Sequence, residues 1–141
     1  MARDILNETL AFLQHLNHEG VDYAVFGAVA MNFHGYPRAT EDLDIFLRGS
    51  EDNIEKLKKA LKRTWADAHI DEIDAKELCG DYPSVRYYPP DDEGMYIDFL
   101  TRLGEFATFA DLDVVTKVID GVPCRVVSPE TLYWMKKGTV R

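Results

Sequence analysis

The chain has 141 residues, of which 46% are apolar and 29% are charged, and this balance is typical of a soluble protein with a core of its own. Its net charge is −9, from 16 Lys and Arg against 25 Asp and Glu, so a general basic field cannot attract long nucleic acid. The sequence contains neither a membrane-length apolar run nor a signal-peptide segment. We therefore expect one cytoplasmic domain over residues 1–141, without a membrane partner.

The first half of the chain contains clear signals for the ends of helices and strands. Apolar residues recur at helical spacing up to Gly20, and Ser50 followed by two acidic residues is a typical helix start. In chain order we expect a helix over residues 3–19, a strand over 21–26, a tight turn at Gly27-Ala28, a short helix over 29–34, a strand from 41 or 42 to 47, and a helix from 50 to about 65.

The second half opens on an acidic stretch, residues 66–82, that fits either a helix or an irregular segment. Asp120-Gly121 between two apolar runs is a strong hairpin signal, and Ser128-Pro129-Glu130 starts a final helix. We expect strands over 84–88 and 95–100 around a turn at 89–94, a short helical turn within 104–112, a hairpin over 114–127, and a helix to Lys137. The fold class is α+β (α/β), a mixed sheet with helices packed on it.

Asp42 and Asp44 are the first candidates for chemistry. Residues two apart in a strand project from the same face, so both carboxylates point one way while Leu43 and Ile45 point into the core. Neighbouring carboxylates resist ionisation unless a cation lies between them. Oxygen ligands favour Mg²⁺ or Mn²⁺. The alternative is an acid pair on an exposed strand end.

Asp98 is the natural third carboxylate. It lies between Ile97 and Phe99 in an apolar strand, where an unpaired charge is costly. If this strand neighbours the Asp42–Asp44 strand, the three carboxylates converge at one edge of the sheet and can hold two metal ions for phosphoryl chemistry. The alternative interpretation is a buried acid paired with an arginine.

The Gly27-Ala28 turn supplies small residues between a strand and a helix, where backbone N–H groups can reach a phosphate. Arg38 and Thr40 precede the aspartates and could neutralise and hydrogen-bond the same phosphate. Each of these signals alone is weak, but their conjunction in this order is not easily accidental.

The pattern Gly-Ala, a short helix, His-Gly-x-x-Arg-x-Thr, Asp-Leu-Asp-Ile and later Tyr-Ile-Asp-Phe-Leu resembles the nucleotidyltransferase superfamily that includes DNA polymerase beta. The long gap between Gly-Ala and the aspartates looks most like the AbiEii-type and lincosamide-type branches, and less like the minimal antitoxin branch. The tail from Val122 to Lys137 also resembles these proteins. The resemblance covers residues 21–137.

This resemblance implies particular roles. Asp42, Asp44 and Asp98 would ligate Mg²⁺ or Mn²⁺, and Asp98 would help to deprotonate the attacking hydroxyl. Gly27 and Ala28 would contact the phosphates of a nucleoside triphosphate. Lys136 is a candidate phosphate contact as well, with its neighbour Lys137 a poorer one.

Two departures from the family pattern keep a second hypothesis open. Ala28 stands where the family usually has Gly or Ser, and the chain ends at Arg141, where relatives tend to continue into a helical domain that holds the acceptor. The leading hypothesis is an enzyme that transfers a nucleoside monophosphate to an RNA end, a protein or a small molecule. The alternative is an inactive module that binds a nucleotide or a partner protein, for example in a toxin–antitoxin pair, or that forms a homodimer. A DxD glycosyltransferase is disfavoured because those folds are longer.

Overall fold

The computed structural model describes residues 3–36, 42–90, 95–105 and 107–138. Its helices are α1 (Arg3–Glu19), α2 (Gly27–Phe33), α3 (Glu51–Thr64), α4 (Ala75–Leu78) and α5 (Pro129–Gly138), with 3-10 turns η1 (Ala68–Glu72) and η2 (Phe109–Asp111). Its strands are β1 (Tyr23–Phe26), β2 (Asp42–Leu47), β3 (Ser84–Tyr87), β4 (Tyr96–Leu100), β5 (Arg102–Leu103), β6 (Ala107–Thr108), β7 (Val114–Ile119) and β8 (Val122–Val127).

The main sheet has six strands in the order β3-β4-β2-β1-β8-β7, and β5 pairs with β6 separately. Strands β2 and β4 run parallel, as do β1 and β8, whereas the remaining neighbours are antiparallel. The predicted mixed sheet is therefore confirmed. The strands that carry the predicted carboxylates, β2 and β4, are central neighbours.

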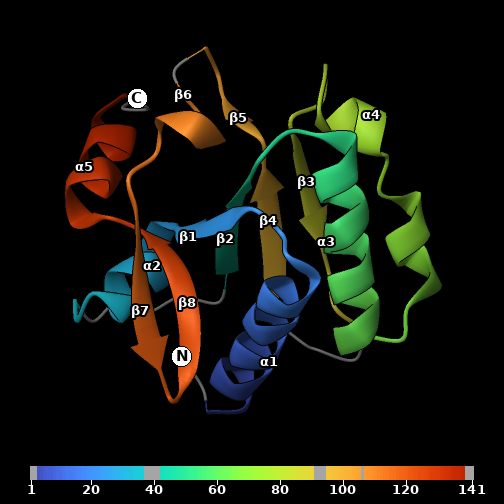
Figure 1. Ribbon diagram of the computed structural model, residues 1–141, viewed down its shortest axis with the longest axis horizontal. Helices are drawn as coiled ribbons and strands as arrows, with labels where there is room; N and C mark the ends of the chain where they lie inside the picture. Colours follow the sequence, from blue (N-terminus) through green and yellow to red (C-terminus); the bar gives the residue numbers. More distant parts are fainter. Residues whose placement is uncertain (1–2, 37–41, 91–94, 106, 139–141) are drawn as a thin grey trace.

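Helices α1 and α3 lie side by side against one face of this sheet (Figure 1). The contact is aromatic at its centre, where the Phe12 ring of α1 lies 6.2 Å from Phe99 of β4 and 5.3 Å from Trp65. Phe99 and Ile97 are both fully buried beneath the helices. Because side chains alternate along a strand, Tyr96 and Asp98 project from the opposite face.

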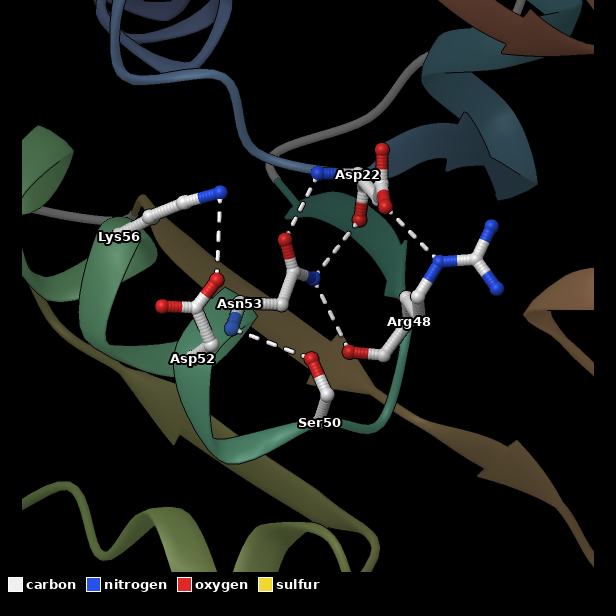
Figure 2. A network of polar contacts seen from close by, with 6 residues as sticks. All are labelled: Asp22, Arg48, Ser50, Asp52, Asn53 and Lys56. Atoms are coloured by element: carbon white, nitrogen blue, oxygen red, sulfur yellow. Dashed lines mark hydrogen bonds and ion pairs between the residues drawn. The ribbon is translucent and has the colours of Figure 1, made fainter.

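A buried polar contact fixes the start of α3 to the ends of two strands (Figure 2). The Asn53 side chain, 4% exposed, accepts from the Asp22 backbone N–H at 2.8 Å and donates to the carbonyls of Asp22 and Arg48 at 3.0 Å each. Ser50 caps the helix by accepting from the Asn53 N–H at 3.2 Å, as its position in the sequence predicts. This contact lies at the end of β2 remote from Asp42.

The predicted hairpin is confirmed, with Ile119 opposite Val122 and positive φ angles of 48° and 81° at Asp120 and Gly121. The ambiguous stretch 66–82 holds η1 and the four-residue α4 instead of one helix, because Asp67 and Asp74 each cap a new turn through the side chain. The predicted turn at 89–94 lies mostly outside the described residues. Within the part of the chain that is described, none of the helices is long and apolar enough to cross a membrane.

Candidate active site

A row of side chains crosses three strands on the face opposite α1 and α3. Asp44 of β2 stands directly beside Asp98 of β4 in parallel register, and Asp98 in turn faces Arg86 of β3. On the other side of Asp44 lies Phe26, the last residue of β1, which leads into the Gly27 turn. The row places two carboxylates next to each other between an arginine and a strand-to-helix turn.

Asp44 lies at the centre of this row. Leu43 and Ile45, on either side of it in sequence, are 1% and 0% exposed, which confirms that the carboxylates and the core residues occupy opposite faces. Burial, and then the negative charges of Asp98 and Asp42, raise the pKa of Asp44 to about 6. The strand pairing therefore concentrates negative charge at Asp44, where a bound cation would be favourable.

Asp98 already has a cationic partner. The Arg86 guanidinium donates from Nε to Oδ1 at 2.8 Å and from the second nitrogen to Oδ2 at 3.3 Å, which is a bidentate pair. The same guanidinium lies 3.9 Å from the centroid of the Tyr96 ring. Its bond to Asp98 raises the pKa of Arg86 further above its usual value. The alternative interpretation of Asp98, an acid paired with an arginine, thus describes the contact seen in the structure.

Asp42 lies two residues before Asp44 on β2, and its partner across the parallel pairing is Tyr96 of β4. The Tyr96 hydroxyl donates to Asp42 Oδ2 at 2.6 Å, and this hydrogen bond raises the pKa of Tyr96 to about 12. Tyr96 therefore contacts two residues of the site: its ring packs against the Arg86 guanidinium, and its hydroxyl donates a hydrogen bond to Asp42.

The turn at Gly27 brings the backbone against the central carboxylate. Gly27 has a φ of +72°, and a Cβ built there would stand 2.2 Å from Asp44 Oδ2. Phe26, which precedes the helix, makes no side-chain hydrogen bond to the first amides of α2. The first amides of α2 therefore receive no cap from the side chain that precedes the helix.

A groove of about 540 Å³ opens beside this turn, between α2 and α5. Its walls are mostly apolar and include Phe26, Met31 and Leu132. Gly27, Ala28 and Lys136 also line it, so the structure brings three of the predicted nucleotide-binding residues to one groove. The Lys137 ammonium lies 5.9 Å from the centroid of the Tyr133 ring, whereas Lys137 itself does not line the groove.

The predicted site residues thus fall into three groups, of which the groove residues Gly27, Ala28 and Lys136 are the first. Asp42, Asp44 and Asp98 share one face of the sheet next to the Gly27 turn. Arg38 and Thr40 lie outside the described residues, so their predicted phosphate contacts stay predictions.

The carboxylates fit a hard divalent cation in chemistry, because all donors are oxygens and because Asp98 and Asp42 place two further negative charges near Asp44. As they stand, however, no three His, Cys, Asp or Glu side chains of the described residues are grouped to hold a metal ion. Two carboxylates of the predicted set have partners of their own, Arg86 for Asp98 and Tyr96 for Asp42. A metal would therefore require these contacts to rearrange.

Sequence reasoning missed Arg86 and Tyr96 as site residues. Both were visible in principle, because Tyr96 stands two residues before Asp98 and shares its face of the strand. Arg86 has the same parity in the preceding strand, but its register with Asp98 depends on the strand pairing, which the sequence does not display.

Comparison with known proteins identifies the family of the chain. Residues 11–137 match the family model described as "Nucleotidyl transferase AbiEii toxin, Type IV TA system". The chain belongs to the AbiEii nucleotidyltransferase family. A crystal structure of a candidate nucleotidyltransferase from Thermotoga maritima has a TM-score of 0.59 and 17% identity, covering 98% of this chain and 88% of that one. No curated protein matches.

Membership of the AbiEii family confirms the branch that the sequence resembles, and the structural likeness confirms the nucleotidyltransferase-like fold. The matched range spans every element of the site, from the end of α1 through the aspartates to Lys136 in α5. A role in nucleotidyl transfer follows from the family.

Proposed function

We propose that this AbiEii-family chain transfers a nucleoside monophosphate from a nucleoside triphosphate to an acceptor hydroxyl and releases pyrophosphate, using two Mg²⁺ or Mn²⁺ ions. The observation that carries the proposal is the in-register pair of Asp44 and Asp98 beside the Gly27 turn. The acceptor is an RNA end, a protein side chain or a small molecule.

Each predicted site residue that the structure describes has a role in this proposal. Asp42, Asp44 and Asp98 would hold the metal, which when bound supplies positive charge to the phosphates and to the attacking oxygen. Asp98 accepts the proton of the acceptor hydroxyl on a carboxylate oxygen. The Gly27 and Ala28 amides donate to phosphate oxygens through the backbone, so Ala28 needs no hydroxyl for this contact. Lys136 approaches the same phosphates from α5.

The neighbouring groove could hold the base and sugar of the nucleotide. Its lining is largely apolar, as expected for a pocket that takes a flat aromatic group, and it ends at the amides and at Lys136. In-line positioning and charge stabilisation, rather than covalent chemistry by the protein, would then supply most of the rate acceleration.

A second candidate is a nucleotidyltransferase-like module that binds a nucleotide or a partner protein without transfer. Two observations favour it: Ala28 replaces the usual Gly or Ser, and Arg86 already neutralises Asp98. The family description as a toxin of a Type IV TA system supports a place in a toxin–antitoxin pair under either candidate. The cytoplasmic location stays a prediction, and a homodimer stays one of the two partner arrangements that the sequence leaves open.

One experiment separates the two candidates. The protein is incubated with each labelled triphosphate, Mg²⁺ and cell extract, and compared with Asp44→Asn and with Asp22→Asn, which alters an acid outside the site. Transfer of label by wild type and Asp22→Asn but not by Asp44→Asn supports the enzyme. Triphosphate binding in calorimetry without any transfer supports the module, and the absence of both contradicts the proposed function.

A further inference from the structure

Arg86 occupies a position that the proposed reaction does not explain. It projects from β3, an edge strand, onto the face that carries the carboxylates, and about half of its side chain (47%) remains exposed. Its guanidinium engages both oxygens of Asp98 and rests on the Tyr96 ring. The Tyr88 side chain also hydrogen-bonds this guanidinium. An exposed arginine with these three partners can leave them without being pulled from a packed core.

The pair between Arg86 and Asp98 opposes the binding of a bare metal ion. A carboxylate that receives two N–H donors from one guanidinium has one acceptor site on each oxygen occupied, so a metal ion must compete with the arginine for Asp98. The arginine also cancels one negative charge in the row, which weakens the attraction of Asp44 and Asp98 for a cation. Among the described residues no group of three metal-ligating side chains is preformed, so Asp98 has its arginine partner and no ready-made metal site around it.

A nucleotide changes this balance because it brings acceptors for the guanidinium. Arginine's planar fork matches phosphate oxygens as well as carboxylate oxygens. If Arg86 turns from Asp98 to a phosphate, its charge remains paired while both Asp98 oxygens become free for a metal. Binding of the nucleotide would then increase the affinity of the site for the metal. Thermodynamic linkage requires the metal to increase the affinity for the nucleotide by the same factor.

We propose that Arg86 is a positioning residue that couples the binding of divalent metal to the binding of nucleotide, by pairing with Asp98 in the free protein and with a nucleotide phosphate in the loaded one. The inference rests on the proposed function, because it requires a metal–triphosphate complex at the Asp44–Asp98 pair.

The chain offers a matched control in Arg48. Its Nε donates to Asp22 Oδ2 at 2.8 Å, its side chain is 49% exposed, and its guanidinium lies 5.0 Å from the Phe109 ring centroid. Arg48 is therefore similar to Arg86 in exposure, in its aspartate partner and in its neighbouring aromatic ring, although it makes one recorded hydrogen bond to its aspartate and Arg86 makes two. Figure 2 shows Arg48 in its pair with Asp22. Arg48 directly follows β2 (Asp42–Leu47), at the opposite end of that strand from Asp42.

The test is a Mn²⁺ titration followed by water-proton relaxation, with and without a non-hydrolysable nucleoside triphosphate. Wild type, Arg86→Gln, Arg48→Gln and Asp44→Asn are compared, the last to show that the ion binds at the row. We expect Arg86→Gln to bind Mn²⁺ alone at least about fivefold more tightly than wild type, and the enhancement by triphosphate to shrink by a similar factor. Arg48→Gln should match wild type in both.

A merely structural role for Arg86 predicts the opposite sign, since a disturbed site binds metal more weakly. Equal or weaker Mn²⁺ binding by Arg86→Gln, with normal triphosphate binding by wild type, overturns this inference and leaves the proposed function intact. Failure of wild type to bind any Mn²⁺–triphosphate overturns both. If Arg86→Gln does not fold, Arg86→Lys keeps the charge but lacks the fork, and intermediate tightening is expected.

Discussion

The Cα of Gly27 lies so close to the Asp44 carboxylate that a methyl group on it would stand 2.2 Å from Oδ2. Gly27 also has a φ of +72°, a conformation that L-residues adopt at a cost of about 1–2 kcal/mol. The glycine therefore meets two requirements at once: it allows the sharp turn from β1 into α2, and it lets the backbone approach the central carboxylate.

We predict that Gly27→Ala lowers the free energy of unfolding by more than the cost of its φ angle alone. Gly20→Ala is the matched control, because Gly20 has the same φ of +72° and no neighbour within 4 Å of a built Cβ. Gly20→Ala should cost about 1–2 kcal/mol, and Gly27→Ala about 1–3 kcal/mol more from the clash. Urea denaturation of both variants measures the difference, and equal losses would contradict the close approach.

Asp44→Asn should stabilise the metal-free protein above pH 6. The folded pKa of Asp44, about 6, is above the value of about 3.9 expected in the unfolded chain, so the folded state binds the proton more tightly. The stability from Asp44 is therefore fully present below about pH 4 and is lost as the pH rises through about 6. Asparagine, which does not ionise, avoids this loss.

The expected gain is about 1–2 kcal/mol at pH 7.5 once solvent screening is allowed for, and it should shrink steadily between pH 7 and pH 4. Thermal unfolding in a chelator at several pH values measures it. Asp22→Asn serves as a control, because Asp22 pairs with Arg48 instead of facing other acids. If Asp44→Asn gained the same stability at every pH, the electrostatic explanation would be wrong.

Lys136→Met should weaken the binding of a nucleoside triphosphate. Lys136 lines the groove with Gly27 and Ala28, whereas Lys137 lies over the Tyr133 ring. Hydrogen bonds to charged groups contribute about 1.5–3 kcal/mol, so we expect at least about tenfold weaker binding for Lys136→Met. Lys137→Met, one residue away with the same charge change, should bind nearly as wild type in calorimetry. Equal effects of the two substitutions would argue for a general charge effect instead.

The sequence predicts those parts of the fold that depend on local pattern. The strand alternation around Asp42 and Asp98, the Asp120-Gly121 hairpin and the Ser50 cap all need only a few neighbouring residues, and the structure confirms each. The stretch from residue 66 to 82 was ambiguous because its helical turns are too short for a periodic signal, and their ends are set by Asp67 and Asp74.

The site itself is only partly a local matter. The sequence predicts that Asp44 and Asp98 face one way if their strands are neighbours, and the parallel pairing of β2 with β4 meets this condition. The register of β3 is different, because it depends on an antiparallel pairing across a loop whose length does not fix it. For that reason Arg86, which faces Asp98 across this pairing, was found from the structure and not from the sequence.

Asn53→Ala should be among the most damaging polar substitutions in the described chain, and its effect should leave the metal site intact. Asn53 is 4% exposed, and its amide makes three hydrogen bonds to the backbone of Asp22 and Arg48 (Figure 2). Its removal leaves these buried backbone groups without a hydrogen-bond partner, which should lower the free energy of unfolding by about 2–3 kcal/mol. Ser50→Ala, which removes one cap bond on the same turn, should cost about 1 kcal/mol.

Because this contact lies at the end of β2 remote from Asp42, both variants should bind Mn²⁺ as wild type once folded. An Asn53→Ala variant that unfolds at the same urea concentration as Ser50→Ala would show that water replaces the lost amide, and that the start of α3 is held to the sheet by its apolar contacts instead.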